Sequence, residues 1–197
     1  MKLQRDFYLR DDVVEIAHDL IGKVIYTHFD NKLTAGIISE TEAYAGAIDK
    51  ASHAYHNRRT NRTEVMFGQG GVSYVYLCYG VHYLFNFVTN QEDIPHAVLL
   101  RGIIPFASVE TMKQRRGLSK PGKGFSDGPG KVTKALGVNM NHNKIDLLGD
   151  SIWVEDKGIN INDEEMLVGK RIGVEYAGED AELPYRFLYN KFSINKA

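Results

Sequence analysis

Acidic, phenolic and imidazole side chains gather in one short stretch of the chain, residues 36–53. The stretch reads GIISETEAYAGAIDKASH: it opens apolar, places Glu40, Glu42 and Tyr44 at alternate positions, and reaches His53 after a short loop. Because alternate side chains of an extended strand share one face, the two carboxylates and the phenol should lie together. Charged groups on such a strand conflict with burial and mark a candidate functional site. An edge strand with a solvated acidic face would show the same pattern.

A single arginine interrupts the most hydrophobic predicted strand. Residues 96–104, HAVLLRGII, are apolar enough for the centre of a sheet, yet they include Arg101. An unpaired buried guanidinium is very costly, so Arg101 needs a carboxylate, and Glu42 or Glu40 is the natural partner. The sequence leaves two interpretations open: a structural salt bridge, or an arginine and a glutamate that share a bound water.

The clearest hairpin joins a strand over 72–78 to a return strand over 83–89. Its predicted tip carries Tyr79, and an aromatic side chain exposed at a hairpin tip needs a reason. One reason is insertion as a wedge between base steps of DNA; the alternative is a tyrosine folded back against its own sheet. Asn86 is a polar residue within the apolar return strand, so it is either hydrogen-bonded in the interior or lines a pocket.

The other elements follow from hydrophobic spacing and from turn residues. We expect Pro105 to end the central strand, Ser108 to cap the helix that follows, and Ser126 or Asp127 to cap the next helix, which Gly137 ends. The predicted helices cover 13–21, 109–116 and 129–136, and the further predicted strands cover 23–29, 33–44, 151–156 and 171–179.

Composition narrows the class of protein. A chain of 197 residues with 43% hydrophobic and 25% charged residues predicts one globular domain over 1–197. A single cysteine, Cys78, excludes an internal disulfide framework, and no apolar run reaches the length of a membrane span. The N-terminus lacks the apolar core of a signal peptide, so we expect a cytoplasmic protein. The chain has seven histidines but no His-Glu-x-x-His zinc motif, no nucleophile elbow and no dinucleotide glycine fingerprint.

Two groups of cations could meet phosphates, although the net charge is only −1. The long polar connection over 46–71 contains three arginines that suit phosphate geometry: Arg58, Arg59 and Arg62. Lys131 follows a glycine-rich turn at a predicted helix N-terminus, a setting that favours anions. Judged alone, each group is explained more simply by a solvated surface.

Short motifs continue this pattern in a fixed order through most of the chain: ETEAY at 40–44, His53, NR at 61–62, MF at 66–67, YVY at 74–76, YG at 79–80, Asn86, LLR at 99–101, SDGPGK at 126–131, AL at 135–136, RIG at 171–173 and AGE at 177–179. In these motifs the chain resembles the alkyladenine (3-methyladenine) DNA glycosylase family. The resemblance implies an α+β fold: a single mixed domain with a curved, mainly antiparallel sheet flanked by helices and a protruding β-hairpin. It also implies a monomer that acts on damaged purines in double-stranded DNA, without metal or cofactor and without a membrane.

The resemblance assigns roles to the matching positions. Glu42 would be the general base, and Arg101 with the main-chain carbonyl of Ile172 would help to hold its water. Asn86 would screen bases at the pocket floor, and Tyr79 would wedge into the minor groove. Three aromatic side chains would form the walls around a flipped base: Tyr44, His53 and Tyr76.

The implied enzyme is a monofunctional glycosylase that releases alkylated or deaminated purines, hypoxanthine among them, and so initiates base excision repair. In a bacterium such an enzyme would associate with the nucleoid. Two rival functions remain open at this point. A non-catalytic nucleic-acid or small-molecule binding module would keep the aromatic hairpin but would not need Glu42. A hydrolase of free nucleosides would keep Glu42 but would not need Tyr79.

Overall fold

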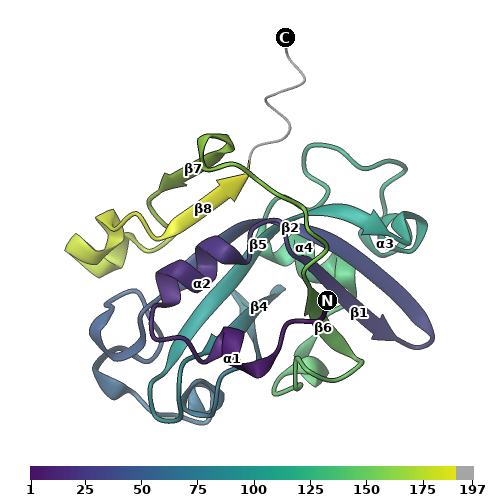
Figure 1. The fold of residues 1–197 in the computed structure, drawn as a ribbon. Coiled ribbons are helices and arrows are strands. Elements are labelled where there is room, and N and C mark those ends of the chain that lie inside the picture. The colour runs from purple at the N-terminus through teal and green to yellow at the C-terminus, as the bar shows by residue number, and fades with distance from the viewer. Residues whose placement is uncertain (190–197) are drawn as a thin grey trace.

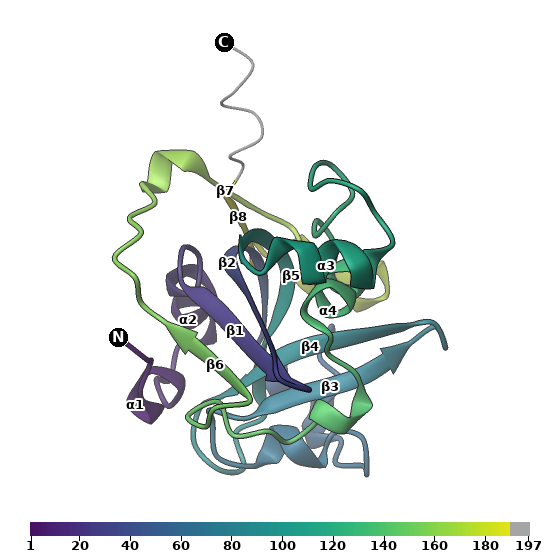
Figure 2. The same ribbon diagram turned by 90° about the vertical axis from the view of Figure 1, so that its right-hand side faces the viewer.

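One antiparallel sheet runs through the part of the chain that this computed structural model describes, residues 1–189. Six strands lie in the order β3-β4-β5-β2-β1-β6, and β8 pairs with both β2 and β7. The sheet curls round on itself (Figure 1), and the β3–β4 hairpin protrudes at one side of the molecule (Figure 2). The strands are β1 (Val24–Phe29), β2 (Lys32–Tyr44), β3 (Ser73–Cys78), β4 (His82–Thr89), β5 (His96–Ala107), β6 (Ile152–Glu155), β7 (Met166–Gly169) and β8 (Arg186–Tyr189). The predicted α+β fold with a curved antiparallel sheet and a protruding hairpin is confirmed.

Short helices complete the fold. Asp12 caps α2, because its carboxylate accepts the backbone N–H groups of Val14 and Glu15. The helix α4 begins with Pro129 and ends at Gly137, whose φ of 78° lies in the left-handed region that glycine adopts without strain. The α-helices are α1 (Arg5–Tyr8), α2 (Val13–Asp19), α3 (Val109–Arg116) and α4 (Pro129–Leu136). The 3₁₀ helices are η1 (Gly46–Ile48), η2 (Tyr55–Asn57), η3 (Glu64–Phe67), η4 (Met140–His142), η5 (Asp163–Glu165) and η6 (Glu175–Glu182).

The main hydrophobic core lies between the sheet and two of the helices. Apolar residues of α2 and α4, such as Ile16 and Leu136, join Ile38 of β2 and Leu100 of β5 in one buried cluster. A second cluster holds η3 against the β3–β4 hairpin, so part of the polar connection over 46–71 is packed rather than free. Within residues 1–189 no helix is long and apolar enough to cross a membrane.

Register shifts in the β2–β5 pair set the position of the buried charges. Glu40 pairs with Gly102 and Thr41 with Leu100, so Arg101 is an extra residue on β5 without a direct partner. Such a bulge bends the strand and redirects a side chain. A Cβ atom on Gly102 would meet the Glu40 Cβ at 2.8 Å, so the close approach of the two strands requires glycine at this position.

One predicted strand end and two predicted helix caps were wrong. β5 does not end at Pro105 but continues to Ala107, because Pro105 pairs with Gly36 beside another register shift, where a missing N–H is tolerated. Ser108 precedes α3 in a left-handed conformation and makes no side-chain cap bond. Neither Ser126 nor Asp127 caps α4: Gly128 occupies the N-cap position.

The strand predicted over 171–179 was also wrong. Residues 171–174 are irregular and lead into η6, and β7, which the sequence did not predict, pairs with β8 instead. β8 was likewise not predicted.

Candidate active site

A cavity of about 770 Å³ opens beside the β3–β4 hairpin. Its lining comes from β2, the connection after β2, both strands of the hairpin, the start of α4 and the segment before η6. Nearly all of the positions singled out in the sequence for a pocket or for DNA contact lie on this lining: Tyr44, His53, Arg62, Tyr76, Tyr79, Asn86, Lys131 and Ile172.

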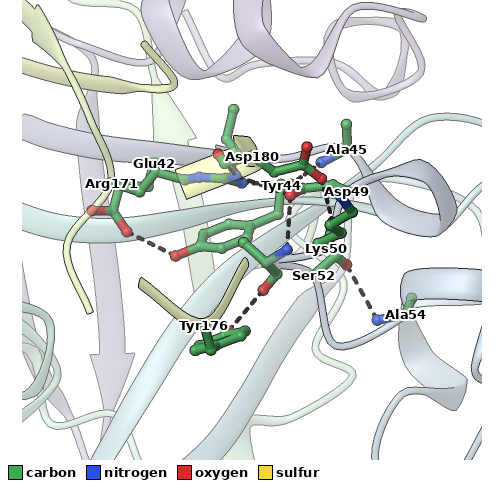
Figure 3. A network of polar contacts seen from close by, with 12 residues as sticks. Glu42, Tyr44, Ala45, Asp49, Lys50, Ser52, Ala54, Arg171, Tyr176 and Asp180 are labelled. Carbon is green, nitrogen blue, oxygen red and sulfur yellow. Dashed lines mark hydrogen bonds and ion pairs between the residues drawn. The ribbon is translucent and has the colours of Figure 1, made fainter. Parts of the chain in front are cut away.

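Glu42 lies directly behind this lining. Its side chain is fully buried, and it bonds two residues that face the cavity. The Tyr44 hydroxyl donates to Oε2 at 2.8 Å, and the Ile172 backbone N–H donates to Oε1 at 2.8 Å (Figure 3 shows the bond to Tyr44). We expected the Ile172 carbonyl to take part; in the structure it is the N–H of this residue that contacts Glu42. The second contact of Oε2, with Arg101, is 3.5 Å long, so this oxygen keeps a lone pair for a further donor.

Four charged side chains share this buried region. Arg101 lies 3.1 Å from Glu40 and 3.3 Å from Glu42, as the sequence predicted, and Arg186 bonds Glu40 at 2.6 Å. Two guanidinium groups therefore balance two carboxylates. Burial raises the pKa of Glu42, while the charge of Arg101 and then the N–H of Ile172 oppose that rise. A carboxylate with a raised pKa close to a cavity is typical of catalytic sites.

Aromatic rings form one wall of the cavity. The His53 and Tyr76 rings lie 4.8 Å apart, edge to face, and His53 Nδ1 lies 2.9 Å from the Tyr74 hydroxyl. The Arg62 guanidinium covers the Tyr76 ring at 4.5 Å and lies 3.2 Å from His53 Nε2. Burial, helped by Arg62 and Arg58, lowers the pKa of His53 to about 4. Because a guanidinium can only donate, Nε2 of the neutral ring accepts and Nδ1 carries the proton.

Asn86 is both hydrogen-bonded in the interior and part of the cavity wall, the two alternatives for a polar residue in an apolar strand. Its side chain is buried, its Nδ2 donates to the Tyr74 carbonyl at 3.1 Å, and it also lines the cavity. The hydrogen bond fixes the amide, so one polar group is held at a defined place on the cavity wall.

The hairpin tip points into solvent. Tyr79 is 92% exposed and is not folded back on its sheet, and its neighbours Leu77 and Val81 are exposed as well. Tyr79 and Gly80 have φ values of 51° and 70°, so both lie in the left-handed region. An aromatic side chain in a conformation that costs energy, and in full contact with water, indicates a function.

Comparison with known proteins places the chain in a family. The family model described as "Methylpurine-DNA glycosylase (MPG)" matches residues 6–192. The chain belongs to the methylpurine-DNA glycosylase family. It is therefore a DNA glycosylase of DNA repair, which hydrolyses N-glycosidic bonds and has DNA as its substrate.

Relatives of this glycosylase match it over nearly their whole length. A protein of Chlamydia abortus (strain DSM 27085 / S26/3) is 43% identical over 187 residues, with 94% of this chain and 97% of the relative covered. A protein of Clostridium perfringens (strain 13 / Type A) is 41% identical over 206 residues, and each chain is fully covered. A protein of Alkaliphilus oremlandii (strain OhILAs) is 39% identical over 195 residues, with 95% of each covered. All three carry the name "Putative 3-methyladenine DNA glycosylase".

The candidate DNA-contacting cations of the glycosylase differ in how they are held. Arg59 is exposed but bonds Glu64 at 2.8 Å and Asp93 at 2.9 Å, so its charge is balanced. Lys131 pairs with Asp127 at 2.9 Å. Arg58 and Arg62 are exposed and have no carboxylate partner among residues 1–189, so these two are the freest of the four to meet a phosphate.

Sequence reasoning missed three charged residues around Glu42. Arg186 completes the charge balance, and Asp49 and Arg171 form a second buried pair next to Tyr44 (Figure 3). Arg171 stands in the RIG motif, but nothing local in the sequence shows that its partner lies 122 residues away.

Proposed function

We propose that this glycosylase flips alkylated or deaminated purines out of duplex DNA into the 770 Å³ cavity and hydrolyses the glycosidic bond with a water activated by Glu42. The observation that carries the proposal is a fully buried carboxylate whose two oxygens are held by two residues of the cavity lining, Tyr44 and Ile172. The product is an abasic site, the first intermediate of base excision repair.

The hairpin tip suits the opening step. A base inside a duplex is out of reach, and its extrusion costs a few kcal/mol, least for a damaged or mispaired base. Tyr79 is exposed at the tip and borders the same cavity, so it can fill the space that the flipped nucleotide leaves. Arg62 and Lys131 line the same cavity, and Arg58 lines a second cavity that also includes Arg62, so we propose that all three contact the backbone around such a nucleotide. We propose that the glycosylase binds as a monomer and that its affinity falls steeply with salt, because phosphate contacts release counterions.

The aromatic wall suits a cationic base. Alkylation at a ring nitrogen makes a purine positively charged, and cation–π attraction to a tyrosine contributes roughly 0.5–2 kcal/mol. The Tyr76 ring already holds a planar cation, the guanidinium of Arg62, at 4.5 Å. Entry of a base onto this face requires Arg62 to swing aside, where its charge is free for a phosphate. His53 is neutral above about pH 4, so the wall does not repel a cationic base.

Glu42 suits the bond-breaking step. Departure of the base leaves a sugar with oxocarbenium character, which a carboxylate stabilises while it takes a proton from the attacking water. General base catalysis of this kind typically contributes about 10²–10⁴-fold to the rate. Arg101 favours the ionised form of Glu42 and so supports this role. An alkylated base is already positively charged, so it takes the bonding electron pair and leaves as a neutral purine without a general acid. An uncharged base such as hypoxanthine would leave as an anion and therefore requires one.

The test is base release from labelled duplexes that each contain one methylated purine, ethenoadenine or hypoxanthine, read by alkaline cleavage at the abasic site. Wild type should release damaged bases, and Glu42→Gln should bind the same duplexes without releasing them. Glu110→Gln is the control, because Glu110 is an exposed glutamate that pairs with Lys113. Release by Glu42→Gln at the wild-type rate would remove Glu42 from the mechanism. Release from free nucleosides at a rate that Tyr79→Ser leaves unchanged would favour the nucleoside hydrolase.

A further inference from the structure

A second buried ion pair lies next to the candidate active site. Arg171 and Asp49 have side-chain exposures of 0% and 1%. The guanidinium bonds both carboxylate oxygens, Nη1 to Oδ2 at 2.5 Å and Nη2 to Oδ1 at 2.9 Å. It also donates to the carbonyl oxygens of Ala43 and Asp180, each at 2.9 Å. This geometry uses four hydrogen bonds from the fork of one arginine, which a lysine could not reproduce.

Arg171 adjoins both groups that hold Glu42. Its guanidinium lies over the Tyr44 ring at 4.8 Å, and the Tyr44 hydroxyl donates to Glu42 (Figure 3). The next residue along the chain is Ile172, whose N–H donates to the other oxygen of Glu42. A shift of Arg171 would therefore disturb both hydrogen bonds to the proposed general base at once.

Asp49 holds the connection that follows β2. Its Oδ2 accepts the N–H of Ala45 at 3.0 Å, and its Oδ1 accepts the N–H of Ala51 at 2.9 Å. These bonds fix the connection that leaves β2 and leads to His53, two residues after Ala51. The same carboxylate thus holds the segment of the aromatic wall and the guanidinium beside Ile172.

Further contacts join the same two segments of the chain. The Lys50 N–H donates to Asp180 Oδ2 at 2.8 Å, and the Tyr176 hydroxyl donates to the Ala51 carbonyl at 3.1 Å (Figure 3). Ala51, Val174 and Ala177 pack together as a small buried cluster between them. The ion pair is therefore the polar centre of a junction between residues 45–53 and 171–181.

We propose that Asp49 and Arg171 form a clasp that holds the Ile172 N–H and the Tyr44 hydroxyl on Glu42, and that both are positioning residues for base release. The inference rests on the proposed role of Glu42 as general base. A general contribution to stability does not explain the placement of the pair, because a buried ion pair contributes little net stability compared with apolar residues. Its bonds join the two segments that carry Ile172 and His53.

The test is the pH dependence of single-turnover base release by Arg171→Lys and Asp49→Asn. When the N–H of Ile172 and the hydroxyl of Tyr44 move away, ionised Glu42 loses donors and holds its proton more tightly. We expect release on the acid side of the pH profile to fall at least about tenfold, with the deficit closing as the pH rises. Affinity for the damaged duplex should stay within about twofold of wild type.

Arg10→Lys is the matched control. Arg10 also pairs with a carboxylate, that of Asp19 at 2.7 Å, bonds the carbonyl of Phe7 and lies over the Phe7 ring, and none of these contacts involves Glu42 or the residues that bond it. Its pH profile should coincide with that of wild type. A loss of rate in the clasp variants that is equal at every pH would overturn the proposal, and so would a loss that comes from weaker DNA binding.

A third variant keeps the proposal testable if the charge substitutions do not fold. Tyr176→Phe removes only the hydroxyl bond to Ala51 from a side chain that is 71% exposed. A smaller deficit confined to the acid side supports the clasp, and an unchanged profile overturns it. The same profiles distinguish failure of the proposed function from failure of the clasp. If the acid side of the wild-type pH profile does not depend on Glu42, the general-base role is wrong. If it does depend on Glu42 but the profiles of the clasp variants coincide with that of wild type, only the clasp is wrong.

Discussion

Replacing Arg101 by methionine should move the whole acid side of the activity profile to higher pH. Arg101 Nε lies 3.3 Å from Glu42 Oε1, and its charge is the largest influence that lowers the pKa of Glu42. At that distance and an effective dielectric constant of about 20, the attraction is about 5 kcal/mol as an upper bound. Retaining about 3 kcal/mol of this after relaxation corresponds to about 100-fold less ionised Glu42 at a given acidic pH.

The assay is single-turnover release of a methylated purine across the pH range, with Arg101→Lys beside Arg101→Met. Lysine keeps the charge but not the planar fork, so its deficit on the acid side should be smaller than that of methionine. Both deficits should shrink as the pH rises and Glu42 becomes ionised again. Melting temperatures of the two variants separate loss of folded protein from loss of ionised carboxylate. An acid limb of Arg101→Met that coincides with that of wild type would refute the electrostatic role assigned to this arginine.

Three further predictions follow from the same site. Burial raises the pKa of Glu42 in the folded protein. Protonated Glu42 therefore contributes fully to the free energy of unfolding below about pH 4, and this contribution is lost as the pH rises through the raised pKa. Glu42→Gln should therefore melt above wild type at neutral pH and level with it near about pH 4; a difference independent of pH would contradict this. His53 should titrate with a midpoint of about 4 in an NMR pH series, and a midpoint at the ordinary value of 6.5 would show that its ring is not buried against Arg62. Asn86→Ala should release undamaged purines about tenfold faster than wild type, and unchanged discrimination would remove Asn86 as a screen.

The parts of the site that lie on regular strands could be predicted from the sequence. Alternation of side chains placed Glu40, Glu42 and Tyr44 together, and the cost of burying Arg101 alone predicted its pairing with those glutamates. Both inferences depend on local spacing and on charge balance, which a single sequence displays directly. The bulge that aims Arg101 was not predictable, because register is set by the partner strand.

The predictions that were wrong concern positions whose structure depends on contacts between distant segments of the chain. Residues 171–179 alternate apolar and polar like a strand, but Arg171 is drawn to Asp49, 122 residues earlier, and the chain then coils into η6. Likewise, Pro105 reads as a strand end until its neighbour Gly36 is known. Local signals could not decide these positions, because tertiary packing overrides propensity there.

The left-handed backbone of Tyr79 lowers the stability of the fold at the position that we propose to act in repair. A left-handed backbone costs a residue other than glycine about 1–2 kcal/mol, and at this tip no buried contact offsets the cost, since the ring is 92% exposed. Glycine or asparagine would occupy the same turn more cheaply. A library of this glycosylase selected only for survival at high temperature should therefore lose the tyrosine early. Selection for survival under alkylating agents should keep it, because the wedge that we propose for Tyr79 is needed for repair in that condition.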